Sequence, residues 1–223
     1  MCGRYSLSVQ AEKIAEYFAI KDVPQVPVRY NIAPTQQVAT VSLADGQTHR
    51  QFQWMRWGLI PSWAKDIKIG ARLINARAET VTQKPAFRSS FKRKRCLVIA
   101  DGFYEWQKVG KQKQPYYFQM KDGSPFAFAG LWDSWQPPEG ETIISCTFLT
   151  TVANEVLQPV HDRMPVILQP EAYTQWLDPQ NKNPEELLRL LGPYPEAAMK
   201  TYPVSTLVNS PTNDVHECIE ESA

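Results

Sequence analysis

The chain of 223 residues is 43% hydrophobic and 21% charged, and its formal net charge is +1. No stretch approaches the roughly 20 apolar residues of a membrane-spanning helix, and the first residues lack the charged-then-apolar pattern of a signal peptide. The four cysteines include no CxxC pair and the three histidines are scattered, which argues against a disulfide framework or a zinc site and predicts a cytosolic protein with no metal and no cofactor.

The small net charge hides a strong asymmetry along the chain. Residues 1–113 contain 19 Lys and Arg against 8 Asp and Glu, a balance of +11, whereas residues 114–223 contain 5 against 15, a balance of −10. This split predicts that the first half of the chain builds a face that binds a polyanion. The densest basic run, KRKR at 92–95, is by itself more typical of a solvated edge than of a binding site.

The chain begins MCGRYS, which places a cysteine directly after the first methionine. Methionine is usually removed when the next side chain is small, so we expect Met1 to be absent and Cys2 to carry a free α-amine beside its thiol. With reference pKa values of about 7.7–8.0 and about 8.5, both groups have a reactive fraction near neutral pH. Together they condense with an aldehyde to an imine and then close to a five-membered thiazolidine. On the dipeptide alone, an accident of the start codon is the better explanation.

Few segments have the pattern of a helix. Apolar spacing, proline and glycine predict helices over residues 8–19, 171–177 and 185–192. Ser8 is the expected N-cap of the first helix.

Strand patterns dominate the rest of the chain. Short aromatic or β-branched runs bounded by Gly, Pro, Asp or Asn predict strands over residues 37–43, 51–57, 95–100, 103–109, 115–120, 125–132 and 146–151. Residues 108–115 are expected to form the tip of a hairpin. With no repeat or linker, we expect a single domain over residues 1–223 of the α+β class, with a β-rich, curved, mainly antiparallel sheet or barrel-like core and peripheral helices.

Three polar residues lie in unexpectedly apolar surroundings: Asn75 in LINARAET, Glu105 in DGFYEWQ and His161 in QPVHDRMPVIL. Each also has an ordinary structural explanation. Strand alternation would turn Glu105 outward, Asn75 would suit a helix cap or a turn, and His161 would suit a hydrogen-bonded loop before an apolar strand. Taken one at a time, these structural explanations are the better ones.

Aromatic and basic residues interleave in QWMRWGLIPSW and the residues that follow. Such a mixture suits single-stranded nucleic acid, in which bases stack and phosphates pair with cations. Since most tryptophans belong to a core, we expect Trp54 and Trp57 to be buried and Trp63, beyond a Pro-Ser turn, to be exposed.

Together, the motifs resemble the SOS-response-associated peptidase (SRAP) family, whose members cross-link to abasic sites in single-stranded DNA. The resemblance runs from residue 2 to about residue 210 and rests on MCGRY, RYNIAPTQ (29–36), WGLIPSW (57–63), LINARAET (73–80), RCLVIADGFYEW (95–106), LTTVANEVLQPVHDRMPVIL (149–168) and YPVSTLVN (202–209). The segment SWAKDIK (62–68) matches less closely.

The resemblance implies a catalytic set. Cys2 would supply both the amine and the thiol that capture the open aldehyde of an abasic site. Glu105 and His161 would transfer the protons that open the sugar ring, release water and reverse the adduct. Burial among aromatics should raise the pKa of Glu105, and Asn75 would orient a sugar oxygen.

The resemblance also implies the DNA contacts. Arg77 and Arg4 would clamp phosphates with their planar forks of donors, and Arg163 would do the same. Pro34, Trp63 and Trp106 would stack on or wedge against bases beside the lesion. The implied partner is single-stranded DNA containing abasic sites, bound by a monomer in the cytoplasm that joins the nucleoid when DNA is damaged.

Two other functions stay open on the sequence alone. Cys2 activated by His161 could serve a cysteine peptidase or amidohydrolase, and the same residues could remove Met1 autocatalytically. The chain could also be a noncovalent single-strand binding module in which Cys2 is incidental. The polyanion bias argues against the peptidase, and acyl transfer by a thiol has no need of a free amine.

Overall fold

Short runs of aromatic and aliphatic side chains build strands that close into a small barrel in the computed structural model, which describes residues 2–43 and 46–222. In chain order the strands and α-helices are β1 (Tyr5–Leu7), α1 (Ala11–Phe18), β2 (Arg29–Ile32), β3 (Gln37–Ser42), β4 (Gln51–Trp57), β5 (Asn75–Arg77), α2 (Arg88–Arg93), β6 (Arg95–Ala100), β7 (Gly102–Val109), β8 (Gln112–Met120), β9 (Phe126–Trp135), β10 (Ile143–Val152), β11 (Arg163–Pro165), β12 (Ile167–Leu168), α3 (Tyr173–Leu177), α4 (Pro184–Arg189) and β13 (Met199–Pro203). Short 3-10 turns fill several of the connections.

The barrel closes because β10 pairs on both sides. The order β10-β4-β3-β6-β9 returns to β10 through an antiparallel β9–β10 ladder, while β4 and β10 run parallel. Its interior holds stacked aromatic rings, with the centroids of Phe128 and Phe148 4.6 Å apart and those of Trp57 and Phe148 5.2 Å apart. Each such fully buried side chain contributes about 1.5–3 kcal/mol, so this stack stabilises the barrel.

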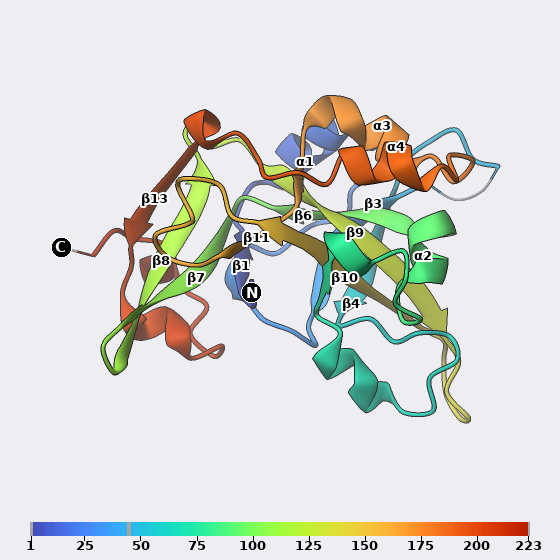
Figure 1. Cartoon of the computed structure of the whole chain (residues 1–223), viewed down its shortest axis with the longest axis horizontal. Coiled ribbons are helices and arrows are strands. Elements are labelled where there is room, and N and C mark those ends of the chain that lie inside the picture. The colour runs from blue at the N-terminus through green and yellow to red at the C-terminus, as the bar shows by residue number, and fades with distance from the viewer. Residues whose placement is uncertain (1, 44–45, 223) are drawn as a thin grey trace.

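A second, antiparallel sheet has the order β13-β8-β7-β1-β2 and lies beside the barrel (Figure 1). Strand β1 joins the two, because the Tyr5 ring is fully buried against Trp57 and Phe148 of the barrel. The other face of this sheet is also covered. Tyr104 and Tyr117 pack there against Val204 and Val208 of the C-terminal segment, so β7 is buried on both faces where it begins.

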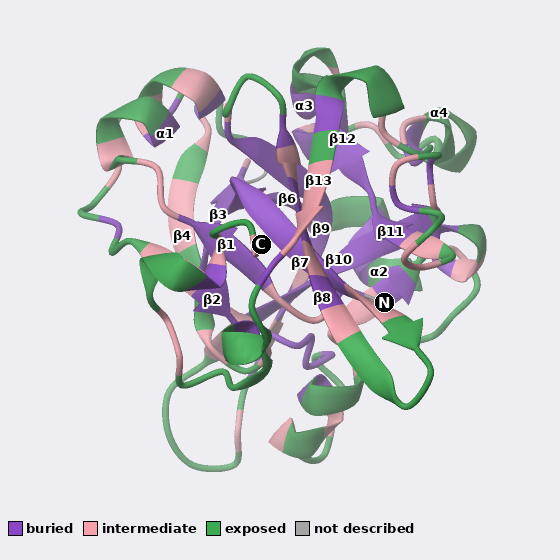
Figure 2. Ribbon diagram, turned by 90° about the vertical axis from the view of Figure 1, so that its left-hand side faces the viewer, coloured by how far each residue is buried: buried purple, intermediate pink, exposed green. Residues whose placement is uncertain are grey.

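The predicted fold class is confirmed: an α+β fold with mainly antiparallel strands, a barrel core and helices at the periphery (Figures 1 and 2). All seven predicted strands and all three predicted helices form, with bounds that differ by a few residues at some ends. The expected hairpin tip is tighter than predicted, since β7 and β8 pair up to Val109 and Gln112. The single domain over residues 1–223 stays a prediction, because Met1 and Ala223 lie outside the described residues.

Two local predictions are wrong. Helix α1 begins at Ala11 with Gln10 as its N-cap, and the Ser8 hydroxyl instead donates to Asp101. Trp54 is 36% exposed, because it lies on the outward face of β4.

The KRKR run is only partly a solvated edge. Arg95 is buried and its guanidinium donates to main-chain carbonyls that include those of Phe91 and Trp176. Lys94 pairs with Asp133. Only Lys92 and Arg93 are exposed, so this run supplies less surface charge than its sequence indicates.

None of the helices among residues 2–43 and 46–222 is both long and apolar enough to cross a lipid bilayer.

Replacing Gly58 by alanine is expected to destabilise the protein. Gly58 has a φ of +119°, and an added Cβ would lie 2.6 Å from the carbonyl oxygen of Gly70. Backbone strain of this kind costs about 1–3 kcal/mol, and the close approach that anchors residues 59–70 would be lost as well. Chemical denaturation measures the change in the free energy of unfolding. A variant as stable as the wild type would contradict this role for Gly58.

Candidate active site

Four segments far apart in the sequence bring the predicted catalytic residues together. Cys2 lies shortly before β1, Asn75 begins β5, Glu105 lies on β7 and His161 lies in the loop before β11. The last two line one open pocket of about 380 Å³. Asn75 is hydrogen-bonded to Cys2, and the charge of Glu105 acts on the Cys2 thiol. The four therefore form one site near the point where β1, a strand of the second sheet, packs against the barrel.

Asn75 is held in place by the barrel and in turn holds Cys2. Strand β5 runs parallel to β10, with Asn75 opposite Phe148, and the Trp57 indole donates to the carbonyl of Ile74 over 2.9 Å. The Asn75 Nδ2 donates to the main-chain oxygen of Cys2 over 2.8 Å. Its buried Oδ1 has no hydrogen-bond partner among the described residues. An unpartnered buried acceptor is costly unless a ligand uses it, so Asn75 can accept a hydrogen bond from a group bound beside Cys2.

Cys2 is buried and its thiol stays protonated near neutral pH. Its side chain has no exposed surface, and the Sγ lies 3.5 Å from the carbonyl oxygen of Arg4. Burial raises the pKa of the thiol well above its usual value, and the nearby charge of Glu105 raises it further. A protonated thiol is a poor nucleophile toward an amide.

Glu105 faces the barrel rather than the solvent. The prediction from strand alternation fails because β7 is buried on both faces at this point, and Glu105 is only 3% exposed. Burial raises the pKa of its carboxyl to about 7, and the charge of Asp162 acts in the same direction. A carboxyl that titrates near neutral pH can both donate and accept a proton under working conditions.

His161 has a defined tautomer. The main-chain N–H of Arg163 donates to its Nδ1 over 2.9 Å, which leaves the proton of the neutral ring on Nε2. Burial lowers the pKa of His161, so the ring is neutral at physiological pH. The Asp162 carboxylate lies 3.0 Å from the same Nδ1 but is 89% exposed, and it forms an ion pair only when the ring is protonated.

The rim of the pocket includes two of the predicted DNA contacts, Arg4 and Trp106. The Arg4 guanidinium donates to Asn31 and to the carbonyl of Val208, and it lies 5.9 Å from the centre of the Trp106 ring. The Trp106 indole donates to Oδ1 of Asn209 over 2.7 Å. The C-terminal segment therefore fixes both side chains.

Asn209 and Lys113 complete the pocket and were not singled out from the sequence. Asn209 is the last residue of the YPVSTLVN motif, and that position is the one feature of the sequence that could have identified it as a site residue. Lys113 had no signal other than the basic character of the hairpin.

The remaining predicted DNA contacts lie outside this pocket. Arg77 is exposed and two residues beyond Asn75 on β5, and Pro34 is half-buried. Trp63 is 59% exposed, as expected, beside a hollow of about 610 Å³ whose rim includes Lys65, Lys68 and Arg72.

Arg163 is a predicted DNA contact whose guanidinium already has an anionic partner. It forms a two-pronged ion pair with Glu79 over 2.6 and 3.0 Å and donates to the carbonyl of Thr150. This arrangement ties β11 to the turn after β5. A phosphate would have to compete with Glu79 for it.

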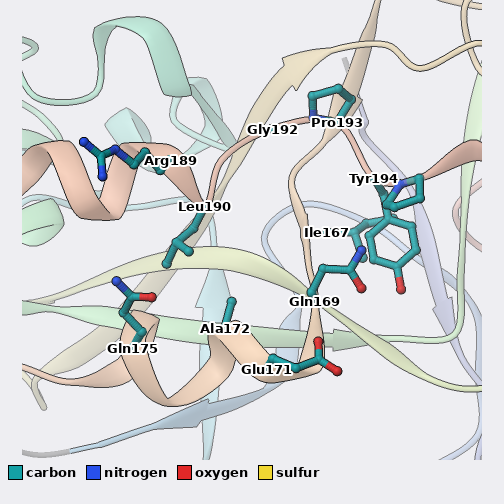
Figure 3. A pocket seen from close by; sticks show the side chains of 11 residues that line it. Ile167, Gln169, Glu171, Ala172, Gln175, Arg189, Leu190, Gly192, Pro193 and Tyr194 are labelled. Atoms are coloured by element: carbon teal, nitrogen blue, oxygen red, sulfur yellow. The ribbon is translucent and has the colours of Figure 1, made fainter.

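Another pocket, of about 440 Å³, lies between α3 and the residues after α4. Figure 3 shows that Glu171 and Arg189, its charged residues, point away from each other. None of the predicted site residues lines it, so we do not assign the chemistry to it. In the part of the chain that the structure describes, no group of three or more His, Cys, Asp or Glu could hold a metal ion.

Comparison with known proteins gives consistent results. The family model described as SOS response associated peptidase (SRAP) matches residues 1–211. Abasic site processing protein YoqW of Bacillus subtilis is 46% identical over 224 residues, which cover 99% of each chain. Abasic site processing protein HMCES of Xenopus tropicalis is 40% identical over 74% of this chain and 56% of its own. A crystal structure of a protein from Bacteroides thetaiotaomicron superposes with a TM-score of 0.89 at 28% identity and covers all of both chains.

Proposed function

Since the chain belongs to the SOS response associated peptidase (SRAP) family, we propose that it acts in the DNA damage response by processing abasic sites. The relatives named above are abasic site processing proteins. In finer detail, we propose that Cys2 forms a covalent cross-link with an abasic site in single-stranded DNA and so shields the lesion. The observation that carries this proposal is the bond from Asn75 to the Cys2 carbonyl, which holds the start of the chain beside Glu105.

The proposed chemistry starts from the open aldehyde of the abasic sugar. After removal of Met1, which lies outside the described residues, the α-amine of Cys2 attacks the aldehyde carbon and forms a carbinolamine. Loss of one water gives an imine. The Cys2 sulfur then bonds to the imine carbon, and the thiol proton moves to nitrogen, so the closed thiazolidine has lost one water overall.

The buried side chains match the proton transfers that these steps require. Ring opening takes a proton from one sugar oxygen and delivers one to another, and dehydration of the carbinolamine needs an acid. Glu105, with its pKa raised to about 7 by burial, is the proposed acid. His161, neutral and protonated on Nε2, is its proposed partner. The open acceptor of Asn75 orients the sugar hydroxyl or the amine.

The proposed DNA face joins the exposed and half-exposed residues around this site. Arg77 and Arg4 clamp phosphates, and Trp63, Trp106 and Pro34 contact bases. Arg163 can bind a phosphate only if its ion pair with Glu79 opens. The monomeric state and a location in the cytoplasm, at the nucleoid on damaged DNA, stay part of the proposal.

Replacing Arg77 by alanine is expected to weaken binding to abasic and intact single strands alike. Its exposed guanidinium would contact a phosphate and no base, and each lost phosphate contact should reduce the slope of log affinity against log salt by about 0.7. Fluorescence anisotropy over a salt series measures both quantities. Arg88→Ala, an exposed arginine on α2, is the matched control. An unchanged affinity and slope in Arg77→Ala would remove Arg77 from the phosphate role.

The peptidase alternative has less physical support. A cysteine peptidase needs a thiolate, whereas burial and Glu105 keep the Cys2 thiol protonated. Self-removal of Met1 remains compatible with the proposal, because it need occur only once per molecule.

A denaturing gel of the protein with an abasic single-stranded oligonucleotide tests the proposed function. We expect a shifted band that survives denaturation and is absent with intact DNA. A shift seen only on a native gel would favour noncovalent binding, and rapid hydrolysis of peptides without any cross-link would favour the peptidase.

A further inference from the structure

The β7–β8 hairpin carries a second hollow that adjoins the active-site pocket. This hollow has a volume of about 540 Å³, and its lining includes Gln107, Lys113, Gln114, Tyr116 and Asn209. Lys113 and Asn209 also line the pocket of Glu105 and His161, so the two hollows meet at this pair. A chain that leaves the catalytic pocket past Lys113 enters the hairpin hollow directly.

The hairpin concentrates positive charge on three lysines. Lys108 and Lys113 lie directly opposite each other in the β7–β8 ladder, and Lys111 lies in the turn between the strands. Like charges opposite each other on paired strands are destabilising. All three lysines are exposed, as is the hairpin tip (Figure 2). None of the ion pairs between described residues involves these lysines. This arrangement favours an anionic ligand that neutralises the repulsion.

The other residues that line the hairpin hollow suit any of the four nucleobases. Side-chain amides can donate or accept hydrogen bonds, so they accommodate the edges of different bases. Gln107 and Gln114 are held by bonds from their Nε2 atoms to the carbonyls of Pro159 and Val204. Tyr116 is half-buried at the same hollow and offers a ring against which a base can pack.

We propose that the β7–β8 hairpin is a subsite for the nucleotides that flank the lesion on one side, with Lys113, Lys108 and Lys111 against their phosphates and the glutamines and Tyr116 against a base. This inference rests on the proposed function, because it takes the strand through the pocket of Glu105 and His161. In this inference the hairpin binds the DNA on one side of the abasic site. Arg77 and Trp63 lie outside both hollows.

The test combines removal of charge with shortening of the DNA. Oligonucleotides carry a stable abasic analogue without an aldehyde, so that binding is reversible, and extend about six nucleotides to one side of it only. Lys108→Gln/Lys113→Gln is compared with the wild type on both half-strands. Lys121→Gln, an exposed lysine just beyond the other end of β8, is the control.

We expect the double variant to lose affinity for one half-strand and to bind the other as the wild type does. The salt slope on the affected half-strand should fall by about 0.7 for each phosphate contact removed. The thermal unfolding midpoint should stay the same or rise, because the repulsion between the two lysines is gone. Lys121→Gln should change none of these quantities.

Equal affinity of wild type and double variant for both half-strands would overturn the subsite. An equal loss on both half-strands would also overturn it, because it would indicate general electrostatic attraction. Covalent capture of an aldehyde-bearing strand by the wild type is scored separately, so a failure of the proposed cross-linking would be recognised independently of the hairpin result.

Discussion

Replacing Cys2 by alanine is expected to abolish the cross-link that survives a denaturing gel. Alanine is also small, so Met1 should still be removed and a free α-amine should remain. That amine can form an imine with the abasic aldehyde, but no thiol is present to close the ring, and imines hydrolyse readily in water. Adding borohydride reduces the imine to a stable amine and should restore a covalent band.

Two further proteins make this prediction specific. Cys96→Ala removes another fully buried cysteine, in the barrel, and should cross-link like the wild type once folded. A tag fused ahead of Cys2 and not processed keeps the thiol but converts the amine to an amide, so it should form no adduct with or without borohydride. A verifiably unprocessed fusion that cross-links as well as the mature protein would contradict the thiazolidine mechanism.

Replacing Glu105 by glutamine is expected to slow cross-linking by about 10²–10⁴-fold, the usual contribution of a positioned acid or base. Burial raises the pKa of Glu105 to about 7, and the carboxyl acts as an acid only while it is protonated. Because titration of the Cys2 amine affects both proteins alike, the ratio of the wild-type rate to the variant rate should fall as the pH rises through 7. Quenched time courses on denaturing gels measure the rates.

Binding of intact single strands should be nearly unchanged in Glu105→Gln, because glutamine keeps the size and the hydrogen bonding. Glu155→Gln, at an exposed position, should match the wild type in every respect. His161→Ala should slow both formation and reversal of the adduct. Wild-type rates in Glu105→Gln and His161→Ala at every pH would remove both residues from the proton transfers.

The raised pKa of Glu105 also makes the free energy of unfolding depend on pH. Above its unfolded value of about 4.3, the folded protein holds a proton that the unfolded chain has released. The contribution of this carboxyl to the free energy of unfolding therefore decreases as the pH rises toward 7. Glu105→Gln does not titrate, so its unfolding midpoint relative to the wild type should be higher at about pH 8 than at about pH 5.

Much of the fold could be predicted from the sequence because its strands carry strong local signals. The aromatic and β-branched runs that became β3, β4 and β6 are bounded by turn residues, and their alternation or burial is legible without the structure. The short strands β1, β2 and β5 were missed because three or four residues carry too little pattern. They form because neighbouring strands supply their partners, as β10 does for β5.

In the candidate site, too, the sequence indicates individual residues but not which residues lie together. Asn75, Glu105 and His161 looked unusual in their apolar surroundings, but only the resemblance to a family joined them into one site. Strand alternation placed Glu105 outward because it could not reveal that the C-terminal segment covers the other face of the sheet. The partners of Arg4 and Arg163 were equally hidden, since Val208 and Glu79 are distant in the sequence.

The most direct measurement is the mass of the cross-linked peptide after protease and nuclease digestion. We expect a peptide that starts at Cys2, without Met1, joined to the sugar remnant with the loss of one water. Its sulfur should resist alkylation by iodoacetamide, because the thiol is consumed in the ring. An adduct on another residue, or one at Cys2 whose thiol is still alkylated, would contradict the central claim that the amine and the thiol of Cys2 together capture the lesion.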